Sequence, residues 1–172
     1  MAELQQFVAR YFLQGGLGWA MIGAAAAVAL GCIGSARGIR IAAAQGAGVM
    51  SEKPELFGKL LVLMALPGTQ GFYSLICAIL IGMWTGLLGG QVNLHPIVGI
   101  AIMAIGIGTG LVEWKSAVFQ GETSAAAINM VARQPESSGR AILLPALVET
   151  YALVALLAAI VLMLFLKSVA IG

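Results

Sequence analysis

The sequence has few charged residues and contains no aspartate at all. Only 9% of its 172 residues are charged and 60% are hydrophobic, whereas a soluble domain carries about 25% charged residues. The mean hydropathy of +1.00 points the same way. This composition predicts a membrane protein, and a net charge of only +2 gives no reason to expect nucleic acid as a partner.

Motifs for catalysis are also missing. The lone histidine, His95, lies beside a proline in a polar connector, and a zinc site needs three or four convergent ligands. Cys32 and Cys77 both lie in apolar runs, where free cysteine packs as a small hydrophobic residue. The Gly58-Lys59 pair lacks the upstream glycine loop of a nucleotide-binding motif. We therefore expect no enzymatic activity from this chain alone.

Long hydrophobic runs dominate what remains. Each exceeds the ~20 residues that a helix needs to cross the hydrocarbon core, and polar connectors containing a proline follow the first and third runs. The pattern predicts an all-α membrane protein with four transmembrane helices in two hairpins. The expected spans are residues 16–44, 56–88, 96–127 and 141–170.

The two hairpins are a tandem duplication. Glu55 and Glu136 each follow a proline, and the same offset of 81 residues pairs Lys59 with Arg140. For the preceding helices the offset is 83, because the first connector is two residues longer. The predicted domains are therefore residues 16–90 and 91–172, after a short N-terminal segment, residues 1–15. That segment has an apolar face of helical spacing, which predicts an interfacial helix.

Basic residues near the span ends set the orientation. Most of them cluster towards the first and third connectors, and only Arg10 and Lys167 lie towards the other side. We therefore expect a multi-pass cell-membrane protein whose hairpin loops, around residues 45–55 and 128–140, are cytoplasmic and whose termini are both outside. The clustered residues are Arg37, Arg40, Lys53, Lys59, Lys115, Arg133 and Arg140.

The odd-numbered spans are rich in glycine and alanine, and the even-numbered spans in leucine, isoleucine and valine. Small residues let helix backbones approach closely in lipid, so helices one and three are expected to form a crowded inner layer. Helices two and four would then form an outer layer facing lipid. Glycine is also generally more frequent in membrane helices, which is the plainer explanation.

One carboxylate, Glu149, lies deep inside the last hydrophobic run. Such a group is costly at bilayer depth, so it must be protonated, paired or bound to a cation. Residues equidistant from a hairpin turn lie at the same depth, and this places Gln120 opposite Glu149. The repeat places Thr69 and Gln70 at that level, with Tyr73 one turn further on.

These side chains offer mainly oxygen ligands, with Tyr73 able to donate a hydrogen bond to the carboxylate. Pro67 removes a backbone donor, and the carbonyl of Leu66 is the one we expect to be freed as a further ligand. An oxygen shell with a single anion suits Na⁺ better than zinc or copper. A proton carrier would need only the acid and a dry pocket. A neutral acid bonded to a glutamine, serving only to join helices, is the structural alternative.

Three motifs together are familiar: residues 66–73 (LPGTQGFY), Gln120-Gly121, and residues 148–151 (VETY). They resemble the membrane-ring proteolipid (subunit K or c) of V-type and A-type rotary ATPases, most closely the sodium-transporting bacterial subunit K. The resemblance implies a homo-oligomeric ring in lipid that turns against a stator membrane subunit (a or I) carrying an arginine. Central-stalk subunits connect it to a headpiece that hydrolyses ATP. The implied Na⁺ ligands are Glu149, Gln120, Gln70, Thr69 and Leu66, with Tyr73 positioning the carboxylate.

The resulting prediction is a rotor subunit that carries Na⁺ on Glu149. The first alternative is the same rotor carrying H⁺. The second is a free-standing four-helix transporter or channel with Glu149 as proton relay, and the third is a purely structural membrane protein. Glu113, Lys115 and Glu122 depart from the family pattern by making the third helix unusually charged. We expect the two acids to lie on the inner surface or to pair with basic residues.

Overall fold

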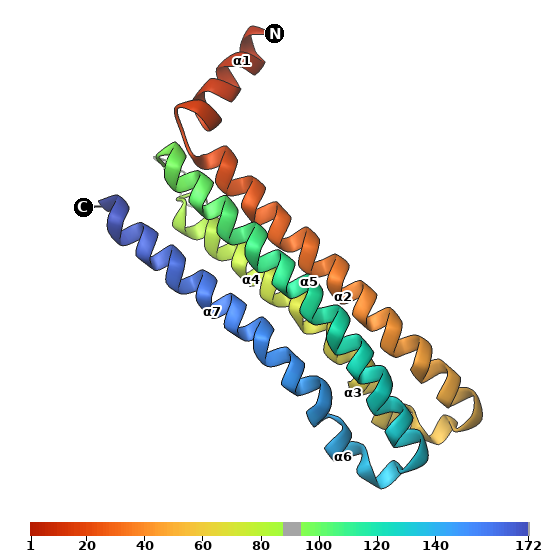
Figure 1. The fold of residues 1–172 in the computed structure, drawn as a ribbon. Helices are drawn as coiled ribbons and strands as arrows, with labels where there is room; N and C mark the ends of the chain where they lie inside the picture. Colours follow the sequence, from red (N-terminus) through yellow and green to blue (C-terminus); the bar gives the residue numbers. More distant parts are fainter. Residues whose placement is uncertain (88–93, 172) are drawn as a thin grey trace.

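The computed structural model describes residues 1–87 and 94–171. Four long helical rods lie side by side along one axis (Figure 1). Within the described residues, four helical segments are long and apolar enough to cross a membrane, which confirms the predicted all-α architecture. The expected domain boundary at residues 90 and 91 lies outside the described residues. The rods are α2 (Leu17–Glu52), α3 and α4 (Phe57–Ala65 and Thr69–Trp84), α5 (Pro96–Arg133), and α7 (Leu143–Ile171).

The first and third helices are longer than their hydropathy predicted. Helix α2 continues to Glu52 rather than to residue 44, and α5 continues to Arg133 rather than to residue 127. The expected connectors were wrong because loss of hydropathy does not end a helix. Each helix instead ends just before a proline, whose ring disfavours helical geometry in the preceding residue.

The two hairpin turns share one backbone geometry. Lys53 has φ −136° and ψ 70°, and Gln134, 81 positions later, has φ −137° and ψ 81°. A short 3₁₀ turn follows each of them, over Pro54–Leu56 and Pro135–Ser137. The second turn leads through the short helix α6 (Ser138–Ala141) into α7. This match supports the predicted duplication of one hairpin.

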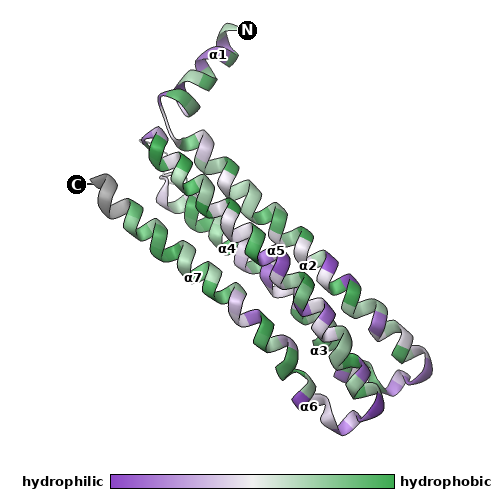
Figure 2. Ribbon diagram, in the orientation of Figure 1, coloured by the Kyte–Doolittle hydropathy of each residue, from purple (hydrophilic) through white to green (hydrophobic). Residues whose placement is uncertain are grey.

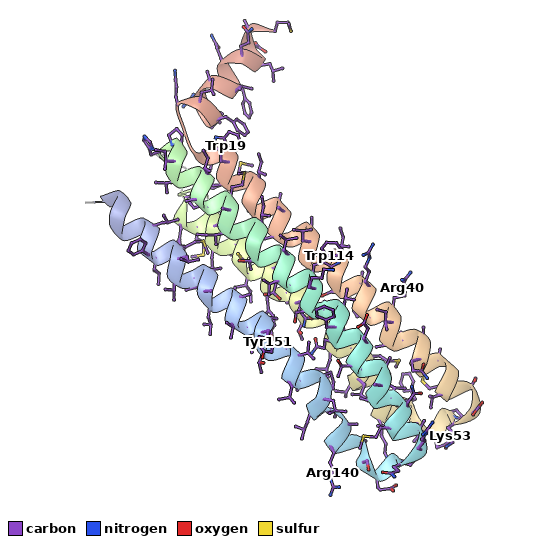
Figure 3. All side chains as sticks on the ribbon, viewed as in Figure 1. Trp19, Arg40, Lys53, Trp114, Arg140 and Tyr151 are labelled. Atoms are coloured by element: carbon purple, nitrogen blue, oxygen red, sulfur yellow. The ribbon has the colours of Figure 1, made fainter. Side chains whose placement is uncertain are left out.

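Side chains join the two hairpin turns to each other. The Lys53 ammonium donates to the carbonyl of Ala132 at 2.6 Å, and Lys59 donates to the carbonyl of Pro135 at 3.1 Å. Both turns therefore lie at the same end of the bundle, where Figure 3 labels Lys53 and Arg140. The helices α2 and α5 thus run side by side over their full length (Figure 1).

Glycines allow α2 and α5 to pack backbone to backbone. A Cβ atom on Gly121 would overlap the carbonyl oxygen of Gly38, and a Cβ on Gly106 would overlap that of Gly23. The predicted close packing of the glycine-rich helices is therefore present within the subunit. The expected placement of this pair on the inner side of a ring stays a prediction.

The core has two hydrophobic parts separated by a polar layer. Leu60, Leu63 and Ile128 belong to the part near the hairpin turns, and Cys77 and Ile81 to the part near the termini. Between them, hydrophilic residues interrupt the hydrophobic colouring midway along α5 and α7 (Figure 2). The candidate site lies in this layer.

The N-terminal segment is helical, as predicted. Helix α1 (Ala2–Val8) continues as a π-helical turn over Ala9–Leu13, and α1 projects away from the bundle (Figure 1). The indole N–H of Trp19 donates to the carbonyl of Phe12 at 2.9 Å, which anchors the segment to α2. Its location at a membrane interface stays a prediction.

Candidate cation site between three helices

One side of the site is formed where the helix of the second span is interrupted. Pro67 is buried and lacks an N–H, so the chain forms a 3₁₀ turn over Leu66–Gly68 between α3 and α4. The carbonyl of Leu66 accepts the backbone N–H of Thr69 and, at 3.0 Å, its hydroxyl. The Leu66 carbonyl is therefore not left without donors, because the tighter turn supplies them three residues on, and its role as an ion ligand stays a prediction. The break instead brings this carbonyl and the Thr69 hydroxyl together.

Two glutamines connect this turn to α5. Gln70 and Gln120 are both 0% exposed. The amide N–H of Gln70 donates to the side-chain oxygen of Gln120 at 2.6 Å, and the hydroxyl of Thr69 lies 3.4 Å from the Gln70 oxygen. Because buried amides are costly without partners, this pairing fixes the facing sides of α4 and α5.

The carboxylate of Glu149 completes the chain of contacts from α7. One of its oxygens accepts the hydroxyl of Tyr73 at 2.7 Å, and the other accepts the side-chain N–H of Gln120 at 3.3 Å. Glu149 itself is only partly buried. The carboxylate therefore lies at the edge of the polar layer, with the glutamines behind it in the core.

The structure thus brings together all six residues that the sequence singled out. The hairpin argument correctly placed Gln120 against Glu149, and the repeat correctly placed the Thr69–Tyr73 segment at the same level. Their role as ion ligands stays a prediction.

Two contributors were missed by sequence reasoning. Ser116, four residues before Gln120, lies 3.5 Å from the Gln70 amide and donates to the carbonyl of Val148 at 3.4 Å. Ser116 could have been predicted from its spacing, because residues four apart lie on the same face of a helix. The carbonyl of Pro145 accepts the Gln120 amide at 3.1 Å. No side-chain pattern marks a backbone carbonyl in this way.

The donor set suits a hard monovalent cation. It combines one carboxylate with amide, hydroxyl and carbonyl oxygens, and such ligands favour neither zinc nor copper. Within the described residues, no group of three or more His, Cys, Asp or Glu side chains could hold a metal. The side-chain amide of Gln120 presents its N–H to Glu149. Rotating that amide by 180° would present its oxygen to a cation held there, provided that the Gln70 amide rotates as well, so that the Gln120 N–H can donate to the Gln70 oxygen.

The additional charged residues of α5 lie outside this chain of contacts. Glu113 is 0% exposed, and neither of its oxygens has a hydrogen-bond partner among the described residues. The expectation that it would lie on a surface or in an ion pair was therefore wrong. Lys115 and Arg37 instead lie over the Trp114 ring, at 5.4 and 5.5 Å from its centre. Glu122 is exposed, and Figure 3 shows Arg40 pointing away from the bundle.

A duplicated hairpin of long apolar helices, with the Glu149 carboxylate bonded into a polar layer, is typical of a membrane proteolipid. Comparison with known proteins identifies the family: the chain belongs to the ATP synthase C-subunit family, which it matches over residues 22–81 and 97–162. This agrees with the resemblance found in the sequence. Proteins of this family are multi-pass membrane subunits that do not hydrolyse ATP themselves.

Two relatives carry the comparison further. The chain is 37% identical over 151 residues to the A-type ATP synthase subunit K of Methanocaldococcus jannaschii, covering 87% of this chain and 64% of that protein. It is 32% identical over 139 residues to the V-type sodium ATPase subunit K of Enterococcus hirae, covering 81% of this chain and 86% of that protein. The chain thus spans somewhat less than two thirds of the archaeal relative.

Proposed function

We propose that this protein is the rotor-ring subunit of a V-type or A-type rotary ATPase and that it carries Na⁺ across the membrane on Glu149. The observation that supports this most is the continuous set of contacts from Thr69 through both glutamines to the carboxylate. Family membership supports the rotor role, and the relative named as a sodium ATPase subunit supports the choice of ion.

The proposed mechanism follows from the cost of a bare charge in lipid. While Glu149 faces lipid it holds a cation, because an unpaired carboxylate there is unfavourable by several kcal/mol. As the ring turns against the stator, an arginine of that subunit attracts the carboxylate, and the cation leaves through an aqueous path. The site reloads from the opposite side before it returns to lipid. The partly buried position of Glu149 suits such exchange.

The neutral ligands favour sodium over a proton. A proton needs only the acid, whereas Gln70, Gln120 and Thr69 add oxygens that serve a larger cation. Both glutamines are fully buried and bonded to each other, so their side chains are held beside the carboxylate, and rotation of the two amides would turn an oxygen towards the cation. The rotor carrying H⁺ remains the alternative that the experiment below separates.

The proposed partners follow from the same assembly. Copies of this chain form a homo-oligomeric ring in lipid, with α2 and α5 on the inner side. A stator subunit (a or I) faces α7 and its carboxylate. Central-stalk subunits contact the two hairpin turns, which lie together at one end of the bundle. This end is cytoplasmic in the proposed orientation, with both termini outside.

Labelling of Glu149 by a carbodiimide, which attacks protonated carboxyl groups, tests the choice of ion. In the purified complex at near-neutral pH, we expect millimolar Na⁺ to protect Glu149 from labelling and K⁺ at equal concentration not to do so. Glu149→Gln should abolish labelling and transport, whereas Glu122→Gln, an exposed acid on α5, should alter neither. Labelling that Na⁺ leaves unchanged would point to protons.

Assembly separates a rotor from a free-standing transporter. We expect the protein to migrate in mild detergent as a high-mass ring and to co-purify with ATPase subunits. A monomer or small oligomer that transports ions without ATPase partners would contradict the rotor proposal.

A further inference from the structure

Glu113 is a second carboxyl group deep in the same subunit, away from the contacts that hold Glu149. It is 0% exposed, and neither of its oxygens has a hydrogen-bond partner among the described residues. Seven residues separate it from Gln120 on α5, which is about 10 Å along a helix axis. It therefore lies about two turns from the proposed sodium site, towards the end of the bundle that carries the termini.

A second buried oxygen without a partner lies on α4. The hydroxyl of Ser74 on α4 is fully buried and also lacks a partner among the described residues. On α2, Gly34 contacts the backbone of Trp114, the residue after Glu113, and Gly31, one turn before Gly34, contacts the Ser74 side chain. The lack of a side chain at Gly31 lets the Ser74 side chain pack against α2, because a Cβ there would overlap the Ser74 hydroxyl.

The charged groups nearby do not neutralise Glu113. Lys115 on α5 and Arg37 on α2 both lie over the Trp114 ring. The titratable side chains facing Glu113 from α4 are Tyr73 and Cys77, which carry no positive charge. From α7 the group in this layer is Glu149, which is itself an acid. A bare carboxylate in this position would be very unfavourable.

We propose that Glu113 and Ser74 form a second cation site, inside the subunit, that is distinct from the site at Glu149. The Glu113 carboxyl group takes one positive guest, and the unpartnered Ser74 hydroxyl is its proposed partner. Few free oxygens are available, because apart from Glu113 itself the buried side-chain oxygens without a partner among the described residues are those of Ser74 and Ser124, and Ser124 lies eleven residues from Glu113 along α5. A proton therefore fits this site better than Na⁺, which needs several oxygen ligands.

Infrared spectroscopy of the purified ring in lipid tests the site directly and does not depend on which ion Glu149 carries. In Glu149→Gln protein at neutral pH, we expect a carbonyl stretch of a protonated carboxyl group that disappears in the Glu113→Gln/Glu149→Gln double variant. If the guest is Na⁺ instead, the Glu149→Gln ring will bind one ²²Na⁺ per subunit, and the double variant will bind none. Either result supports a second site, and the absence of both would overturn it.

A second variant keeps the test decisive if rings with Glu113→Gln do not assemble. Ser74→Ala removes the proposed partner but retains the acid. We expect the Glu113 signal, whether the infrared band or the ²²Na⁺ affinity, to shift relative to protein with Ser74. An unchanged signal would contradict the pairing of Glu113 with Ser74.

The affinity of the sodium site provides an independent readout, which rests on the proposed function of Glu149. An uncompensated charge on Glu113, about 10 Å away, would strengthen cation binding at Glu149 by roughly tenfold at an effective dielectric constant near 20. If Glu113 holds a positive guest, replacing it with neutral glutamine should change the Na⁺ affinity at Glu149 by less than about twofold. A tenfold loss of affinity would show that Glu113 is ionised and would overturn the second site.

Discussion

The hydrogen bond from Tyr73 to Glu149 allows a quantitative test of the proposed sodium site. The hydroxyl lies 2.7 Å from one carboxylate oxygen and comes from a different helix, so it fixes where the charge lies. Tyr73→Phe removes this donor and keeps the ring that packs in the core. A hydrogen bond to a charged group contributes about 1.5–3 kcal/mol, and each 1.4 kcal/mol is a factor of ten in affinity. We therefore expect Na⁺ binding to weaken roughly ten- to a hundredfold.

The assay is the Na⁺ concentration that halves carbodiimide labelling of Glu149 in the purified complex. Loss of the donor also makes the ionised carboxylate less favourable, so labelling without Na⁺ should rise. Both effects move the half-protecting concentration upwards.

Tyr151→Phe is the matched control, because Tyr151 lies two residues from Glu149 but is 72% exposed. We expect it to behave like the wild type. If Tyr73→Phe required no more Na⁺ than Tyr151→Phe, the tyrosine would not position the carboxylate, and the proposed geometry of the site would be wrong.

Two further predictions concern packing. Gln70→Leu leaves the buried oxygen of Gln120 without its donor, so we expect a loss of about 1–3 kcal/mol in stability together with loss of Na⁺ protection. Gln45→Leu breaks only a solvent-exposed hydrogen bond to Asn129, so it should lower stability less and leave Na⁺ protection unchanged. Thermal unfolding and carbodiimide labelling measure the two effects. Gly121→Ala pushes a methyl group onto the backbone of α2, so we expect the ring to dissociate at a lower temperature, as native gels would show. Gly139→Ala is the control, because Gly139 has open space around it, and it should not alter dissociation.

The features that the sequence predicted correctly are those that depend only on a residue's depth in the membrane. A hairpin brings residues equidistant from its turn to the same level, which is why Gln120 was correctly placed against Glu149. The duplication then placed Thr69 and Gln70 at that level without any contact information. Both arguments need only the positions of the turns, and the prolines mark those positions clearly.

The features that the sequence did not predict depend on how each helix is rotated about its axis and on local hydrogen bonding. Hydropathy gives the depth of Glu113 but not the direction in which its side chain points, so its burial between helices was missed. The fate of the Leu66 carbonyl depended on whether the chain at Pro67 opened or tightened, and it tightened into a 3₁₀ turn. The ends of α2 and α5 were misplaced because polar residues beyond the hydrocarbon remain helical.

If Glu149 carries the cation as proposed, the hydrogen bonds around it also explain why this chain cannot set the direction of transport alone. Without a cation, Tyr73 and Gln120 each donate a hydrogen bond to one carboxylate oxygen. The hydroxyl of Tyr73 and the amide of Gln120 therefore keep a partner when the ion leaves. Those donors are neutral, however, and the unloaded site keeps its negative charge. Returning it to lipid remains unfavourable by several kcal/mol. In the proposed mechanism, unloading therefore needs a positive charge from outside the subunit, and the position of that charge on the proposed stator decides to which side the cation is released.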